Sequence, residues 1–211
     1  FPITCQGALS MFWWGKEDHN PLTFYPFLSK IGNMNTKTRE MITASIEDFH
    51  FPKYDEIPNV GLYLEQITKY INEYLAPFED LTITASMISN YVKKGLIANP
   101  VKKQYYREQI AYLFFIATAK SVLSLDNIAL FLEMQKQTYT AKKAYDYFCM
   151  EFENVLAHVF GLKEELDTIG VDNTHEKTML RNTIITIAHK IYLDKCFHAI
   201  RTEKESLSEE I

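Results

Sequence analysis

The sequence contains few residues that interrupt regular structure and none of the short motifs of common enzymes. Seven glycines and seven prolines among 211 residues leave little material for long loops or disordered segments. Phosphate-loop, dinucleotide-binding, nucleophile-elbow and zinc-protease motifs are all absent. We therefore predict no enzymatic activity, no catalytic residues and no cofactor.

Cysteine spacing and hydropathy indicate the compartment in which the protein is expected to occur. Cys5, Cys149 and Cys196 lack C-x-x-C spacing, so they predict neither a disulfide framework nor a metal site, and they fit a reducing compartment. No apolar run reaches the ~18 residues of a membrane span, and residues 1–33 lack the basic and apolar regions of a signal peptide. We expect a soluble, cytoplasmic protein with no membrane partner. Met11 and Met34 are both candidate starts, so no function is assigned to residues 1–33.

Charge is distributed unevenly along the chain. The net charge of −5 argues against indiscriminate binding to nucleic acid. Residues 81–107 nevertheless carry five basic side chains and no Asp or Glu, so the rest of the chain must carry −10. A basic segment within an acidic protein predicts one localised surface for an anionic partner.

Apolar residues recur at three- and four-residue spacing over most of the chain, which predicts an all-α fold. Pro52 and Pro58 predict an extended linker. Thr84 and Ser124 are expected N-caps, and Gly95 is expected to end the helix that Thr84 begins. The expected helices cover about 35–45, 62–75, 84–94, 107 to the break at 123, 124–132, 140–160 and 174–201, followed by a frayed acidic tail at 203–211.

The middle of the chain has the order of elements expected for a winged helix-turn-helix. Met87, Ile88 and Tyr91 would hold the helix at 84–94 to the core. After Leu96-Ile97 and the turn signal Asn99-Pro100, a two-stranded wing is expected with Lys102-Lys103 at its tip and 104–106 as the returning strand. The polar face of the helix would carry Ser86, Ser89, Asn90, Lys93 and Lys94.

This segment resembles the DNA-binding head of the MerR family of transcription regulators. The matching residues run from Ile83 to Ile97, continue through the lysine wing and Tyr105, and end with 108–113 and 125–132. With the Pro-x-x-Gly-Leu-Tyr-Leu-Glu-Gln run at Pro58–Gln66, the chain is more similar still to an uncharacterised bacterial family, domain of unknown function 1836. That resemblance covers roughly Phe49–Met134.

The resemblance implies a DNA-binding transcription regulator with its recognition helix at 84–94 in the major groove and the wing lysines on phosphates. The implied organisation is an N-terminal extension (1–48), a MerR-like head (49–134) and a C-terminal helical hairpin or bundle (135–211) that dimerises or receives a signal. The implied partners are double-stranded DNA and a second copy of the chain, with an unknown effector or protein partner also allowed. The candidate DNA-binding residues are Thr84, Ser86, Ser89, Asn90, Tyr91, Lys93, Lys94, Lys102, Lys103, Tyr105 and Arg107.

Three alternative interpretations remain open. In the first, the winged scaffold binds a protein partner and does not bind DNA. Ser86 and Ser89 favour this interpretation, because MerR-type helices usually carry arginines at these positions. In the second, His189 and Cys196 share a helix face and form a metal or redox sensor, although satisfied core residues are the favoured interpretation. In the third, the Tyr and Phe residues of the 140–160 helix line a small-molecule pocket, although packing or a dimer interface is favoured.

Overall fold

The structure, a computed structural model, describes residues 36–170 and 173–209, so the predictions made for residues 1–35 lie outside the described residues. The predicted, mostly helical architecture is confirmed, with one small antiparallel sheet. In chain order the elements are α1 (Thr36–Ala44), η2 (Tyr54–Glu56), β1 (Leu62–Tyr63), α2 (Leu64–Leu75), η3 (Glu79–Leu81), α3 (Ala85–Lys93), β2 (Gln104–Tyr105), α4 (Arg107–Ala119), α5 (Leu125–Thr138), α6 (Ala141–Val159) and α7 (His175–Glu209).

The helices begin and end at residues whose chemistry explains the boundary. The hydroxyls of Thr84, Ser124 and Thr140 each accept a hydrogen bond from the backbone N–H three residues later, which caps α3, α5 and α6. At the other end of α3, Gly95 has a φ of +74°. Its N–H donates to the Val92 carbonyl while the Leu96 N–H donates to the Tyr91 carbonyl, a Schellman motif that turns the chain sharply.

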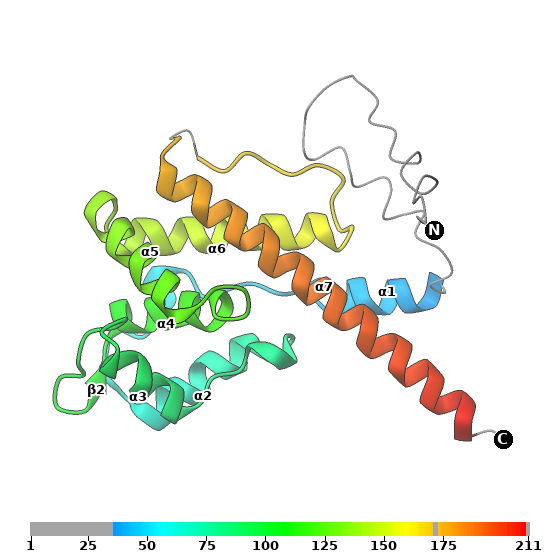
Figure 1. Cartoon of the computed structure of the whole chain (residues 1–211), viewed down its shortest axis with the longest axis horizontal. Helices are drawn as coiled ribbons and strands as arrows, with labels where there is room; N and C mark the ends of the chain where they lie inside the picture. The colour runs from blue at the N-terminus through cyan, green and yellow to red at the C-terminus, as the bar shows by residue number, and fades with distance from the viewer. Residues whose placement is uncertain (1–35, 171–172, 210–211) are drawn as a thin grey trace, which may run out of the picture. The chain divides into compact units, whose positions relative to one another are not determined.

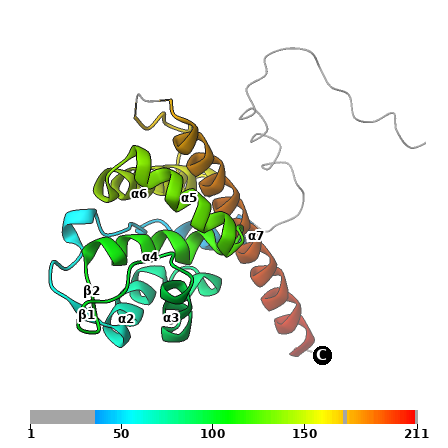
Figure 2. The same cartoon turned by 60° about the vertical axis from the view of Figure 1, so that its left-hand side comes forward.

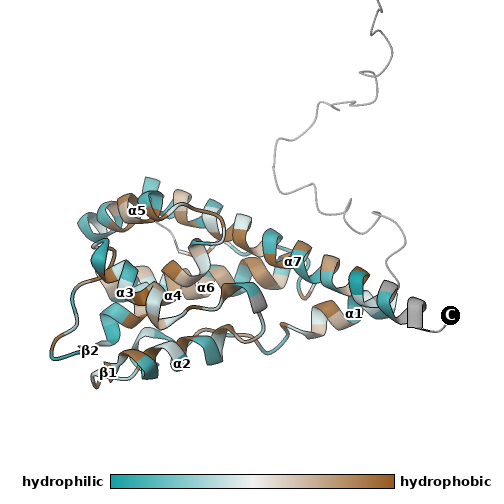
Figure 3. Cartoon of the chain, turned by 60° about the horizontal axis from the view of Figure 1, so that its bottom comes forward, coloured by the Kyte–Doolittle hydropathy of each residue, from teal (hydrophilic) through white to brown (hydrophobic). Residues whose placement is uncertain are grey.

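Helix α4 lies at the centre of the unit formed by residues 36–211. Nine of its thirteen residues are buried, because α2 covers it on one side and α6 and α7 cover it on another. Figures 1 and 2 show α4 between the α2–α3 pair and the α6–α7 pair. Figure 3 shows polar and apolar residues side by side on the outer helices, as expected for helices with one buried face.

The linker before β1 joins the two sides of this core. Phe51 is 2% exposed, and its ring lies 5.7 Å from Phe114 of α4 and 5.0 Å from Phe152 of α6. The Phe51 N–H donates to Glu153, and the Tyr54 N–H donates to Asp146, so two α6 carboxylates hold the linker backbone. The segments predicted as a head and a C-terminal region therefore share one aromatic core.

Two details differ from the sequence-based expectations. The returning strand of the expected wing, β2, pairs with β1 rather than with Leu96-Ile97. Leu96 and Ile97 are each 2% exposed, because the turn at Gly95 directs them into the core, where they cannot form an edge strand. Helix α7 continues through the tail that was expected to fray, because no Gly or Pro between Thr202 and Glu209 ends it.

Candidate nucleic-acid interface

Helix α3 is a short amphipathic helix held by its apolar face. Ile88 and Tyr91 are fully buried and Met87 is half-buried, as the sequence predicted. The opposite face is exposed and contains hydroxyl, amide and ammonium groups only. Its residues are Ser86, Ser89, Asn90, Lys93 and, at the C-cap, Lys94, with the capping Thr84 exposed at the start.

The turn before α3 is fixed by two side chains that the sequence did not single out. Asn72 of α2 donates its Nδ2 to the Ile83 carbonyl and accepts the Ile83 N–H on its Oδ1, both at 2.9 Å. From α4, Lys120 donates its ammonium to the Thr82 carbonyl at 2.6 Å, and partial burial lowers the pKa of this lysine. These bonds set the angle at which α3 leaves the core.

The loop after α3 ends in a two-residue hairpin. Val101 and Gln104 exchange both backbone hydrogen bonds, and Lys102 and Lys103 between them have φ values of 51° and 65°. Two positive φ values define a type I′ turn, which usually selects Asn and Gly because other residues are strained there. Both lysines are exposed at the tip, as predicted. Lysine at two positions that disfavour it indicates a role other than stability.

The hairpin base is pinned to the rest of the unit. Gln104 and Tyr105 pair with Tyr63 and Leu62 of β1. A Cβ added to Gly61 would lie 2.8 Å from the Gln104 Cβ, so only glycine lets the two strands approach this closely. Gln109 accepts the Tyr106 N–H and donates to the carbonyls of Ala98 and Asn99, which fixes the loop between α3 and the hairpin.

Three of the eleven candidate DNA-binding residues are instead buried in the core or bonded to the linker. Tyr91 and Tyr105 are 2% and 4% exposed, and burial raises the pKa of both phenols. The Arg107 guanidinium donates to the carbonyls of Ile57 and Asp55, and its Nη1 lies 3.5 Å from the Asp55 carboxylate. Arg107 thus anchors the linker to α4, and the available cations of the segment are its four lysines.

These four lysines face little opposing charge. Lys93, Lys102 and Lys103 form no ion pair with any described residue. The Lys94 ammonium lies 3.9 Å from Asp126 of α5, an exposed contact that contributes little to stability. Figures 1 and 2 show α3 and the hairpin on the side of α4 away from α6. This arrangement presents hydrogen-bonding groups and positive charge together.

The histidines and cysteines of the C-terminal helices do not assemble into a metal site. No group of three or more His, Cys, Asp or Glu residues with metal-binding geometry occurs among the described residues. Cys149 and Cys196 are buried free thiols, and burial raises the pKa of both. A raised thiol pKa disfavours the reactive thiolate, so neither cysteine has the character of a redox sensor.

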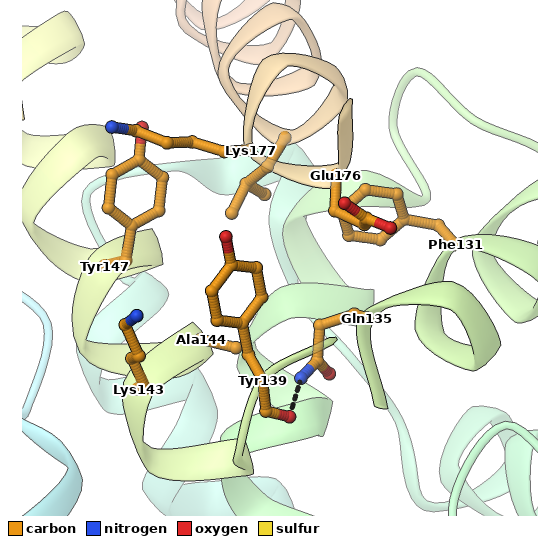
Figure 4. Close-up of a pocket in the computed structure, with 9 residues that line it drawn as sticks. Phe131, Gln135, Tyr139, Lys143, Ala144, Tyr147, Glu176 and Lys177 are labelled. Carbon is orange, nitrogen blue, oxygen red and sulfur yellow. Dashed lines mark hydrogen bonds between the residues drawn. The ribbon is translucent and has the colours of Figure 1, made fainter. Parts of the chain in front are cut away.

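A small cavity of about 50 Å³ lies where α5, α6 and α7 meet, at the aromatic face proposed as a pocket (Figure 4). Phe131, Ala144 and Leu180 give it apolar walls, and Tyr139 is among its lining residues. Gln135, 5% exposed, donates its Nε2 to the Tyr139 carbonyl at one edge. This volume holds a few water molecules but is well below the ~150 Å³ of a cavity that binds benzene. Its size favours ordinary packing.

The described residues thus define a helical protein with a two-stranded sheet and a basic, polar helix-and-hairpin surface. Residues 52–148 match the model of a protein family described as Domain of unknown function (DUF1836), which supports the resemblance stated from the sequence. This match extends past the predicted end at Met134 into α6, whose Phe148 packs 5.7 Å from Phe115 of α4. Neither the curated proteins nor the solved structures gave a match to the chain.

Within the part of the chain that the structure describes, no helix has both the length and the apolar character needed to cross a bilayer. Even the 35-residue α7 carries polar and charged residues throughout, among them Arg181, Lys190 and Arg201.

Proposed function

We propose that the protein is a DNA-binding transcription regulator with a MerR-like winged helix-turn-helix head, acting as a homodimer. In this proposal α2 braces the head, α3 enters the major groove and the lysine hairpin contacts a neighbouring phosphate run. The observation that carries the proposal is the exposed face of α3, which combines Ser89, Asn90 and Lys93 on a helix whose other face is buried.

The chemistry of this surface divides between reading bases and binding the backbone. Asn90 offers an amide donor and acceptor that pair with the edge of adenine, while Ser86 and Ser89 bond to bases or phosphates. Lys93, Lys94, Lys102 and Lys103 supply attraction to phosphate that does not depend on base sequence. Residues 81–107 contain no Asp or Glu, so no carboxylate of this segment repels DNA phosphates, although the chain as a whole is acidic.

A second candidate function is a protein-interaction module that keeps the scaffold and does not bind DNA. Exposed apolar side chains around the small sheet favour it: Tyr63 is 52% exposed, Val101 57% and Tyr106 42%. A cluster of exposed large side chains beside a hairpin is typical of protein contacts. The serines on α3 in place of arginines point the same way.

Fluorescence anisotropy with random genomic duplexes over a salt series tests the proposal. Four phosphate-binding lysines in each protomer, eight in the homodimer, predict a log–log salt slope of about −7, since each contact contributes about −0.9. The variant Lys93→Glu/Lys103→Glu should lose binding. Lys53→Glu/Lys136→Glu is the matched control, because it makes the same charge change at exposed lysines of the linker and α5.

The outcomes separate the two functions. Binding that is lost in the α3–hairpin variant and kept in the control supports the regulator and justifies selection for its target sequence. Equal losses in both variants would mean that the DNA responds only to total charge. Absence of binding at low salt by a folded wild-type chain would reject the regulator and favour the protein-interaction module.

A further inference from the structure

A cavity of about 160 Å³ lies between α7 and the connector that joins α2 to α3. Phe78 and Leu81 of the connector and Ile191 of α7 form its apolar floor, and each is at most 4% exposed. The volume is similar to the ~150 Å³ of a cavity that binds benzene, unlike the 50 Å³ of the cavity beside Tyr139. The cavity is therefore large enough for one small ring or branched chain.

The polar part of the lining carries nitrogen donors on one side of α7. Lys195, His198 and Arg201 line the cavity at a spacing of three residues, which keeps them on one face of the helix. Arg201 is exposed and forms no ion pair with any described residue. A guanidinium binds a carboxylate through two parallel hydrogen bonds, and a neighbouring ammonium adds positive charge. These groups favour an anionic ligand.

Two carboxylates also line the cavity, and they do not cancel this preference. Asp194 forms an ion pair with Lys190, one turn earlier on α7. Asp80, which is exposed on the connector, is the other carboxylate. Among the described lining residues, it stands against an ammonium, a guanidinium and an imidazole. The balance of charge is positive, so a ligand with negative charge is favoured over a neutral or cationic one.

We propose that this cavity binds a small carboxylate with an apolar body and thereby regulates α3. The body of the ligand packs on the apolar floor, and its carboxylate lies beside Arg201. The connector gives the ligand a short path to α3, because Leu81 is followed directly by Thr82 and Ile83. The backbone of these two residues is bonded to the side chains that set the angle of α3. The effect on DNA affinity rests on the proposed function, whereas binding of the carboxylate does not.

Fluorine NMR titration of the full chain tests the site with three probes that share one ring. 4-Fluorobenzoate should bind about five- to tenfold more tightly than the neutral 4-fluorobenzamide, because a hydrogen bond between charged groups is stronger than one between neutral groups. Cationic 4-fluorobenzylamine should bind most weakly. Titration to about 10 mM detects millimolar affinities, and absence of 4-fluorobenzoate binding at that concentration would overturn the proposal.

Arg201→Gln should lower the affinity for 4-fluorobenzoate to about that for the amide. Lys69→Gln is the matched control, because it removes an exposed cation of α2 that does not line the cavity, and it should bind like the wild type. Equal affinities for the three probes, or equal losses in the two variants, would overturn the proposal.

Amide hydrogen exchange locates the site, and the anisotropy assay tests the regulation. 4-Fluorobenzoate should slow exchange in residues 78–84 and 191–201 and leave α5 unchanged. At matched ionic strength, a saturating concentration should change DNA affinity at least about threefold, and DNA should change the affinity for the probe by the same factor. Binding of both without this mutual effect would overturn the regulation. Probe binding without DNA binding would reject the proposed function alone, whereas DNA binding without probe binding would reject this inference alone.

Discussion

The side-chain amide of Asn72 holds both polar backbone groups of Ile83, at 2.9 Å each, and so joins α2 to the start of α3. Ile83 is 2% exposed, so water cannot readily replace these bonds. Together with the Lys120 bond to the Thr82 carbonyl, this contact sets the angle between the bracing helix and the proposed recognition helix. A substitution of Asn72 is therefore expected to change both the free energy of unfolding and the affinity for DNA.

Asn72→Leu should lower the free energy of unfolding by about 2 kcal/mol, because two buried backbone groups lose their partners. DNA affinity should fall as well, although no DNA-facing group changes. Urea denaturation and the anisotropy assay measure the two effects. Glu73→Leu is the neighbouring control: its exposed side chain forms an ion pair with the exposed Lys69, and its loss should leave both quantities nearly unchanged.

Lys102→Asn/Lys103→Gly should stabilise the protein while weakening DNA binding. Asn and Gly are the residues that a type I′ turn prefers, so relieving two strained lysines should raise the free energy of unfolding by about 1 kcal/mol. The same change removes two positive charges from each hairpin tip, four in the homodimer, and should make the salt slope about three to four units less negative. Lower stability would show that the lysines are not strained. Unchanged DNA affinity would remove the hairpin from the interface.

Local chemistry was sufficient to predict most helix boundaries. Thr84, Ser124 and Gly95 act through backbone groups only a few residues away, so their roles follow from sequence alone. The polar face of α3 was predicted for the same reason, because helical periodicity fixes which residues share a face.

Contacts between distant segments were not predictable in this way. Gln104 and Tyr63 are 41 positions apart, and no local signal connects the hairpin with the two residues before α2. Arg107 was assigned to DNA because it continues the basic segment, yet its partner is the linker carbonyl of Ile57, fifty residues earlier. Asn72 and Lys120 carry no local signal either, because their partners on the turn before α3 lie 11 and 38 positions away in the chain.

Removing only one partner of the buried ion pair between α6 and α7 should strongly lower the stability of the protein. Glu151 has no exposed surface, and Arg181 Nε lies 3.1 Å from its carboxylate. Arg181→Met should lower stability by about 3–5 kcal/mol, because it removes the ion-pair partner of a fully buried carboxylate. The double variant Glu151→Leu/Arg181→Met should recover at least half of the loss. A double variant as unstable as Arg181→Met would show that packing rather than charge is responsible.

The same pair should show a defined pH dependence. Burial raises the pKa of Glu151 above its usual 4.5, against the opposing effect of Arg181. For a carboxyl with a raised pKa, the stabilising contribution is complete below the unfolded value and is lost as pH rises through the folded value. Removing Arg181 raises that pKa further. The defect of Arg181→Met should therefore be larger at about pH 8 than at about pH 5, as urea titrations would measure.

His189 should make the protein sensitive to acid. Burial, and secondarily the nearby His158, lowers the pKa of His189 below 6.5. The unfolded chain then binds the proton more readily, so the contribution of His189 is complete above pH 6.5 and is lost as pH falls through the folded value. His189→Gln should flatten the decline in stability below pH 6.5 by up to about 1.4 kcal/mol per pH unit, the limit for one proton. His175→Gln, which removes an exposed imidazole at the start of α7, should keep the wild-type profile. Parallel profiles for all three proteins would mean that other groups cause the decline.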